Sequence, residues 1–190
     1  LPALYCSRTM IIHEDGREYC LSKIKAVKPS FPNAIIQNIA SGNTMVFNNA
    51  TRGLLRMAGP SLDIYAHDWW TYLAVMAAQG ITVFDEQPSV KYRQHDNNQV
   101  GATVSLPAML RRTRLDRNGR LRQTIDQNIA AIHAVRPQVS PANLALVQDF
   151  EQLRCQTPIG RIRAFLHLPF KRQSFLGSCS LALAAWLGRI

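Results

Sequence analysis

The chain has 190 residues, 47% hydrophobic and 18% charged, a composition that excludes an intrinsically disordered protein and suffices for a buried core. Its net charge of +10 is uneven: residues 1–104 carry nine Lys/Arg against eight Asp/Glu, and residues 105–190 carry thirteen against four. The basic C-terminal part is therefore expected to meet an anionic surface, whether phospholipid, nucleic acid or an acidic partner. Because the chain opens with Leu1 and no signal segment precedes the first strand pattern, we expect a piece of a longer protein.

The first elements predict a hairpin and then a loop. Residues 3–13 are strand-like, residues 14–16 (Glu14-Asp15-Gly16) are a turn signal, and residues 19–24 are expected to form the partner strand. Two prolines within residues 28–32 fix φ and remove backbone donors, so regular structure should break there.

The cysteines argue against a structural zinc site. Cys6, Cys20, Cys155 and Cys179 have neither a C-x-x-C spacing nor histidines at metal-ligand intervals. Cys6 and Cys20 could face each other across the hairpin, but free thiols are the expectation in a reducing compartment.

Strands and helices alternate in the next stretch. Residues 45–47 predict a buried strand, and Asn49 or Thr51 is expected to cap a short helix that ends near residues 59–60. An apolar run over residues 69–79 predicts another helix.

Two polar clusters flank this apolar run, at residues 67–70 and 92–101. Gly80 should end the helix, and two short strands are expected at residues 81–84 and 90–93. The intervening chain can then fold back and bring both clusters together, which predicts a functional site.

The C-terminal part predicts helices. Ser105 and Pro107 have the character of an N-cap and a first-turn proline, and residues 121–135 place apolar side chains on one face. Two further helices are expected, over residues 140–154 and from Thr157-Pro158 onward.

The last stretch, residues 165–190, mixes aromatic and basic residues. It has no apolar run near the ~20 residues that span a bilayer, so it cannot cross a membrane alone. Two alternatives are open: the stretch lies in the headgroup region of an anionic membrane, or it docks on the half of the protein that is missing from this sequence.

Asp68 precedes the apolar run and has two interpretations. At a helix N-terminus a carboxylate is an ordinary cap, since free N–H groups and the helix dipole hold it anionic. In a cleft, the same carboxylate would be a general base for a substrate hydroxyl.

The remaining residues of the two clusters also have more than one interpretation. Trp69 and Trp70 suit the C–H faces of sugars, yet at least one is expected in the core. His95 lies in a loop rich in donors and acceptors, where it would ligate a divalent cation, touch a phosphate, or simply face solvent.

Four segments together resemble family 2 glycosyltransferases, closest to the rhamnosyltransferase-like group, and the resemblance covers about residues 3–104. They occur in the order and spacing of that family's second half: Ala3-Leu4-Tyr5-Cys6, Gln37-Asn38-Ile39-Ala40-Ser41-Gly42-Asn43-Thr44, His67-Asp68-Trp69-Trp70, and Tyr92-Arg93-Gln94-His95-x-Asn97-Asn98-x-Val100-Gly101.

The resemblance implies that residues 1–104 are the C-terminal portion of a Rossmann-like GT-A domain, which has an α/β fold. The charge distribution and the helix signals predict that a basic, α-helical extension follows in residues 105–190. It implies an inverting transfer of a sugar, such as rhamnose, from a nucleotide-sugar donor to a glycan or lipid-linked acceptor in surface polysaccharide synthesis. Asp68 would be the catalytic base, and His95 would assist a divalent cation, Mg²⁺ or Mn²⁺. The substrate-binding residues would be Gly42, Asn43, His67, Trp69, Trp70, Arg93, Gln94 and Asn98.

The sequence departs from the family pattern in one respect. It contains no Asp-x-Asp, the motif that holds the metal in the upstream half of such enzymes. We therefore expect the 190 residues to be inactive alone, and the parent protein to act in the cytoplasm or peripherally on the inner face of the plasma membrane.

Two other classes of protein are considered. A non-enzymatic remnant, or an interaction or membrane-binding module, is expected if no upstream half is made. A nucleic-acid binder is suggested by the arginines of residues 111–122, but no helix-turn-helix, finger or aromatic-interleaved signature accompanies them, so we rank it last.

Overall fold

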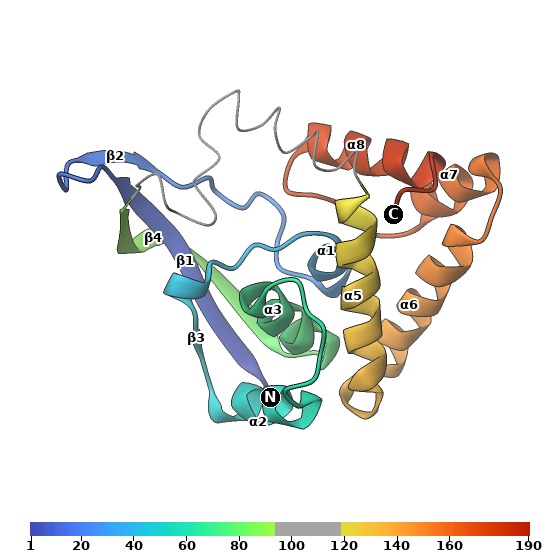
Figure 1. Cartoon of the computed structure of the whole chain (residues 1–190), viewed down its shortest axis with the longest axis horizontal. Helices are drawn as coiled ribbons and strands as arrows, with labels where there is room; N and C mark the ends of the chain where they lie inside the picture. The colour runs from blue at the N-terminus through green and yellow to red at the C-terminus, as the bar shows by residue number, and fades with distance from the viewer. Residues whose placement is uncertain (94–118) are drawn as a thin grey trace.

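The computed structural model describes residues 1–93 and 119–190, which form a small mixed sheet and a set of helices (Figure 1). The predicted mixed α/β architecture is confirmed. The strands are β1 (Ala3–Ile12), β2 (Glu18–Leu21), β3 (Val46–Phe47) and β4 (Ile81–Arg93).

Strand β1 is the middle of the sheet. β4 runs parallel along one edge of it, from the pair Ala3 and Ile81 to the pair Ile12 and Arg93. β2 and β3 both pair antiparallel with β1 at opposite ends of the other edge. The prediction of two separate strands after Gly80 was wrong: β4 is continuous, and register shifts opposite Ser7 and Arg8 absorb the extra residues before Pro88.

The predicted hairpin is confirmed, with β2 shorter than expected. His13 N–H donates to the Arg17 carbonyl across the turn. Cys20 pairs with Ile11, whereas Cys6 lies beside Phe84 of β4, so the two cysteines do not face each other across the hairpin. All four cysteines are free thiols.

Helix α1 (Phe31–Ile36) begins where the sequence predicted only a break. Pro32 stands in the first turn, where its missing N–H costs nothing, and Ser30 caps the helix by accepting from Asn33 N–H. The proline signal thus marked a helix start.

The segment after α1 contains the 3₁₀ turn η1 (Gly42–Thr44), β3 and α2 (Asn49–Ala58). Asn48 caps α2, one residue before the expected candidates, and Gly59 ends it with a φ of 76°. The prediction of a buried strand was wrong, since Val46 is 65% exposed and Phe47 is 44% exposed.

Five further helical elements follow in the described chain: α3 (His67–Ala77), α5 (Arg120–Ala134), α6 (Pro141–Arg154), α7 (Pro158–His167) and α8 (Phe175–Trp186), with the 3₁₀ turn η2 (Arg136–Gln138) between α5 and α6. Ser140 and Thr157 cap α6 and α7 as predicted. The helix expected from Ser105 lies outside the described residues.

One core joins the sheet to these helices. The buried side chains run from Leu4 on β1 through Leu73 on α3 and Ile125 on α5 to Leu181 on α8. Asn128 on α5, only 3% exposed, donates its side-chain N–H to the Ile35 carbonyl on α1 at 3.0 Å. Among residues 1–93 and 119–190, no helix has the length and apolar character needed to cross a membrane.

Candidate functional site

The Gly42 turn lies against the first turn of α3. A Cβ atom built on Gly42 would lie 2.9 Å from His67 Nε2 and 3.6 Å from Asp68 Cβ, so the backbone passes directly over these two residues. His67 is exposed and Asp68 is half-buried. The Gly42 turn and the polar cluster at residues 67–70, which stand far apart in the sequence, are therefore adjacent in space.

Hydrogen bonds to β1 hold this turn in place. The buried Thr44 hydroxyl accepts from Ser7 N–H at 3.2 Å and donates to the Ser41 carbonyl at 2.9 Å. At the tip, Ser41 Oγ donates to Asn43 Oδ1 at 2.7 Å, which leaves the exposed Asn43 amide group facing outward with the turn. The turn is thus attached to the middle of the sheet and presents polar groups beside Asp68.

Asp68 is in the first turn of α3 without being its cap. The N-cap is Ala66, which makes no side-chain capping bond. Asp68 Oδ1 accepts from Trp69 N–H at 2.7 Å, and Oδ2 has no donor within the described residues. The free N–H groups of the first turn and the positive end of the helix dipole lie beside this carboxylate. One oxygen is therefore held by the helix, and the other is available to a ligand.

The two tryptophans have different surroundings. Trp70 is 6% exposed and belongs to the core, so a substrate can reach little of its ring in this packing. Trp69 is half-buried, donates its indole N–H to the Ala34 carbonyl at 2.6 Å and makes an edge-to-face contact with Tyr65. Arg120 of α5 lies over the Tyr65 ring, 5.6 Å from its centroid. Trp69 thus belongs to a small aromatic group next to Asp68.

The second predicted cluster is only partly described. Arg93 ends β4 opposite Ile12 and donates to the Glu14 carbonyl at the hairpin. The Gly42 turn is attached at Ser7, five positions back along β1, which corresponds to roughly 17 Å of strand. Arg93 itself is therefore not brought to Asp68. Gln94, His95 and Asn98 lie outside the described residues.

The divalent cation expected from the sequence requires a group of ligating side chains. Across residues 1–93 and 119–190 there is no group of three or more His, Cys, Asp or Glu side chains that could hold a metal ion. The proposed partners of His95, an upstream Asp-x-Asp, are not part of this sequence.

Asp85 is a second structured carboxylate that the sequence analysis did not single out. It accepts from Tyr5 Oη at 2.8 Å and from Gln87 N–H at 2.8 Å, and these bonds, the Gln87 N–H first, lower its pKa. It pairs with Ser7 on the face of the sheet opposite to Leu4 and Cys6, so it does not join Asp68. The sequence feature that could have identified Asp85 is the polar run at residues 85–89, which interrupts the strand pattern.

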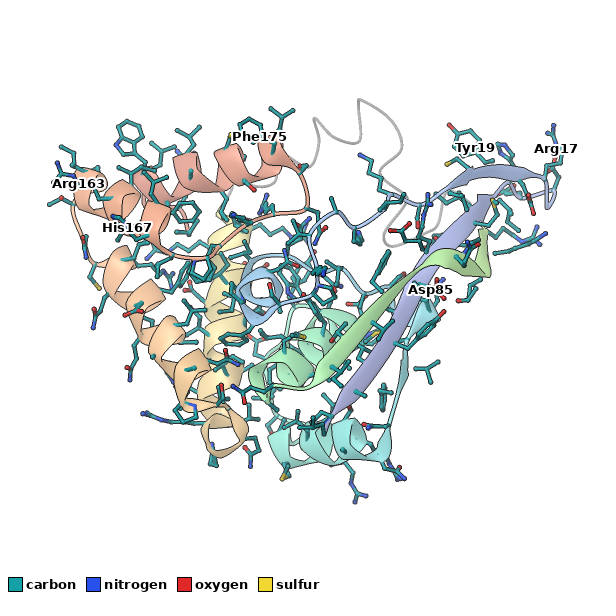
Figure 2. The ribbon with its side chains drawn as sticks, turned by 180° about the vertical axis from the view of Figure 1, so that it is seen from behind. Arg17, Tyr19, Asp85, Arg163, His167 and Phe175 are labelled. Carbon is teal, nitrogen blue, oxygen red and sulfur yellow. The ribbon has the colours of Figure 1, made fainter. Side chains whose placement is uncertain are left out.

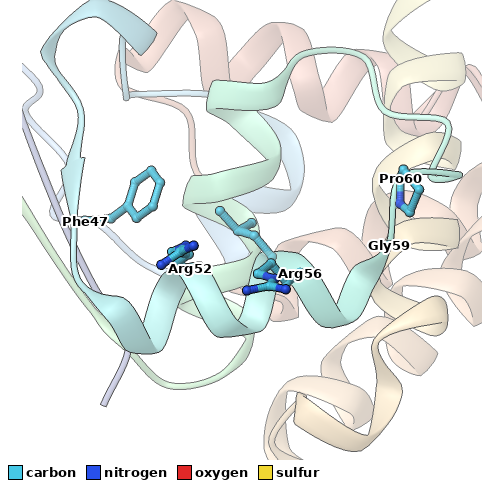
Figure 3. Close-up of a pocket in the computed structure, with 6 residues that line it drawn as sticks. Phe47, Arg52, Arg56, Gly59 and Pro60 are labelled. Carbon is cyan, nitrogen blue, oxygen red and sulfur yellow. The ribbon is translucent and has the colours of Figure 1, made fainter.

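A shallow hollow lies along α2 (Figure 3). It has a volume of about 400 Å³. Arg52 and Arg56 are exposed on α2 at its side, and neither has an ion-pair partner among the described residues. Its lining residues are Phe47, Arg52, Leu55, Arg56, Gly59 and Pro60. In the sequence, the lining residues of the hollow lie between the Gly42 turn and His67.

Comparison with known proteins finds a distant relationship to a glycosyltransferase. The chain is 28% identical over 161 residues to the dTDP-rhamnosyl transferase RfbG of Shigella flexneri, an alignment that covers 79% of this chain and 55% of the relative. The chain thus spans about half the length of the relative that it matches. No family model matches the chain. No solved structure matches it either.

Proposed function

We propose that this chain is the acceptor-side part of an inverting glycosyltransferase of the GT-A type, which transfers a sugar from a nucleotide-sugar donor to an acceptor hydroxyl. The observation that carries the proposal is the position of Asp68 at the start of α3, directly under the Gly42 turn. The distant relationship to a dTDP-rhamnosyl transferase supports it and makes dTDP-rhamnose the first donor to test.

Asp68 acts as the general base in this proposal. Its Oδ2 takes the proton of the acceptor hydroxyl, the acceptor oxygen forms a bond to the anomeric carbon, and the bond from that carbon to the diphosphate oxygen breaks. The bonding electrons leave with the nucleoside diphosphate. Trp69 N–H keeps Oδ1 in place at 2.7 Å, so Oδ2 keeps a fixed direction during proton transfer.

His67, Asn43 and Trp69 surround this carboxylate and are proposed to position the acceptor. The hollow on α2 is proposed to hold a further part of the acceptor: its apolar lining and its two guanidinium groups suit an acceptor that carries an anionic group next to an apolar one. Gly42 is needed because a larger residue would press on the His67 ring.

A divalent cation bound to the diphosphate would offset the charge that develops on the leaving group. We propose that His95, together with an upstream Asp-x-Asp, holds it. Gln94 and Asn98, from the same stretch of sequence, are proposed to contact the substrates.

The test uses the protein together with any in-frame sequence found in the genomic DNA upstream of Leu1. An in-frame half with Asp-x-Asp is expected, and the longer protein should transfer rhamnose from dTDP-rhamnose. Asp68→Asn should abolish the transfer while donor binding, measured by calorimetry, stays largely unchanged. Asp63→Asn is the matched control, since Asp63 is an exposed carboxylate in the loop before α3. Normal turnover by Asp68→Asn would remove Asp68 from the mechanism.

His95 is tested separately in the same longer protein. His95→Ala should weaken binding of the nucleotide-sugar in the presence of Mn²⁺ and should have little effect without the metal. His13→Ala, at an exposed position on the hairpin, is the control. An unchanged titration with Mn²⁺ would reject the role of His95.

One alternative function follows from the absence of Asp-x-Asp in the sequence. If the native protein consists of this chain without a donor-binding half, it is a binding module instead of an enzyme. The intact mass of the protein isolated from its own cells separates the two, because only the enzyme requires a substantially longer chain.

A further inference from the structure

The outward face of α8 is apolar. Phe175, Leu176 and Leu183 are 82%, 76% and 56% exposed, and Trp186 and Leu187 are 45% and 44% exposed. The helix contains no charged residue. It lies along one edge of the molecule (Figure 1), and Figure 2 shows side chains along it, Phe175 among them, pointing away from the body of the protein. A helix face of this kind is unusual on a water-exposed surface.

Helix α7 packs against α8 and has an exposed side of its own. Ile159 is 64% exposed and Leu166 is 73% exposed, and the helical spacing puts the exposed Arg163 and His167 on the same side of α7 as these two residues. We call the exposed side chains of these two helices the α7–α8 face; its apolar members are Ile159, Leu166, Phe175, Leu176, Leu183, Trp186 and Leu187.

The α7–α8 face is held in place by contacts on its inner side. Leu181 and Ala185 bury the opposite side of α8 in the core. Three arginines hold the end of the chain: Arg161 donates to the Trp186 carbonyl at 3.0 Å, Arg122 to the Gly188 carbonyl at 3.0 Å, and Arg154 to the Ile190 carbonyl at 2.8 Å. Cations at these carbonyls also match the negative end of the helix dipole. The face therefore exists before any partner arrives.

The charged residues in the C-terminal segment that contains this face are all basic. Residues 152–190 contain six Lys/Arg and no Asp or Glu. Arg163 and Lys171 are exposed, and no described carboxylate forms an ion pair with either. An apolar surface bordered by these cations matches a layer of acyl chains topped by anionic headgroups.

We propose that the α7–α8 face binds the surface of an anionic phospholipid bilayer. α8 has 12 residues, about 18 Å of helix, so it lies in the headgroup region and does not cross the apolar layer of roughly 30 Å. Phe175 and Trp186 stand at its two ends, and aromatic side chains at this depth anchor a helix parallel to the surface. This binding is independent of the sugar-transfer chemistry proposed above.

The test is sedimentation of the 190-residue chain with vesicles. Equal parts of phosphatidylglycerol and phosphatidylcholine should bind the chain at low salt and release it at high salt, whereas pure phosphatidylcholine should bind it weakly. The double variant Leu176→Glu with Leu183→Glu should weaken binding to the anionic vesicles at least on the order of tenfold. Arg163→Gln with Lys171→Gln should weaken it on the order of twentyfold, since each cation near the surface contributes about fivefold.

Single-residue controls carry the same kinds of substitution elsewhere. Met57→Glu alters an apolar side chain on α2 that is 61% exposed, and Arg136→Gln removes an exposed cation in η2, just after α5. Both should bind vesicles as the wild type does. Thermal melting confirms that each variant is folded before its binding is compared.

Three results would overturn the proposal: equal binding to anionic and pure phosphatidylcholine vesicles, equal binding by the face variants and their controls, or no vesicle binding together with a dimer that Leu176→Glu with Leu183→Glu dissociates. The last result would assign the α7–α8 face to a second copy of the chain. None of them bears on Asp68, whose role is measured by sugar transfer in detergent solution.

Discussion

At the scale of single residues, buried hydroxyl groups connect elements that the sequence separates. Tyr72 on α3 is 0% exposed; its hydroxyl accepts from Ser30 N–H at 3.0 Å and lies 3.2 Å from the Ser30 carbonyl. Burial raises the pKa of this hydroxyl, so it stays neutral and keeps its proton for donation. Because Ser30 is the cap of α1, one hydroxyl fixes the start of that helix against α3.

Tyr72→Phe should lower the free energy of unfolding by about 1–3 kcal/mol, because Ser30 N–H loses its acceptor in a partly buried place. Denaturant unfolding measures the effect. Tyr19→Phe, at a position 58% exposed on β2, should change stability by no more than about 0.5 kcal/mol. Equal effects of the two substitutions would contradict this role of the Tyr72 hydroxyl.

The Asp85 carboxylate provides a second prediction at this scale. Its pKa is lowered by Gln87 N–H and by the Tyr5 hydroxyl, so its stabilising effect is present above the pKa of the unfolded chain and is lost as the pH falls through the folded value. Tyr5→Phe should move the pKa of Asp85 upward while the bond from Gln87 remains. NMR titration of the Asp85 side chain measures this shift, and an unchanged pKa would show that the Tyr5 bond is not formed in solution.

At the scale of elements, local sequence signals predicted where most helices begin. They did not predict the extent of strand β4 or the exposure of strand β3. Ser140-Pro141 and Thr157-Pro158 combine a cap with a first-turn proline, which is local chemistry and needs no tertiary information. Strand β4 was divided into two because Pro88 and its polar neighbours look like a turn, whereas pairing with β1 carries the strand through a bulge. The exposure of Val46 and Phe47 depends on what covers the sheet, which local sequence does not encode.

Alanine substitutions at Gly80, which follows α3, and at Gly53, inside α2, should change the stability of the protein in opposite directions. A Cβ on Gly80 would lie 2.5 Å from the Pro2 carbonyl oxygen and 2.8 Å from Val75 Cγ1, so Gly80→Ala should destabilise the protein by about 1–3 kcal/mol. Gly53 has no atom within 4 Å of such a Cβ and lies inside α2, so Gly53→Ala should stabilise by about 0.5–1 kcal/mol. Thermal melting of both variants tests the pair, and a shift of the same sign in both would refute the reading of these contacts.

At the scale of the whole molecule, the helices after residue 119 share a core with the sheet, although the charge pattern suggested a separate extension. Half of the candidate site followed from the sequence: the resemblance selected Gly42 and Asp68, and the fold brings them together. The contribution of His95 did not follow, because its segment lies outside the described residues. The burial of Trp70 depends on tertiary packing, which the hydrophobic periodicity of the sequence alone does not predict.

We predict that the sheet and the helices unfold as one unit. Asn128→Ala removes the buried bond from α5 to the Ile35 carbonyl and should cost about 1–3 kcal/mol, whereas Gln123→Ala on the exposed side of α5 should cost little. Far-UV circular dichroism and tryptophan fluorescence should report the same transition before and after the substitution. Two separate transitions would instead indicate two independent domains.

Within the described residues, one face of the sheet carries exposed apolar side chains. Ile81 and Val83 are 55% and 51% exposed on the side away from α3, and the edge strand β3 adds Val46 at 65%. The protein is consequently expected to self-associate at high concentration. A solvatochromic dye that binds exposed apolar surface should fluoresce with the native protein before heating. Charged replacements at Ile81 and Val83 offer a practical way to keep the chain dispersed for crystallisation or spectroscopy.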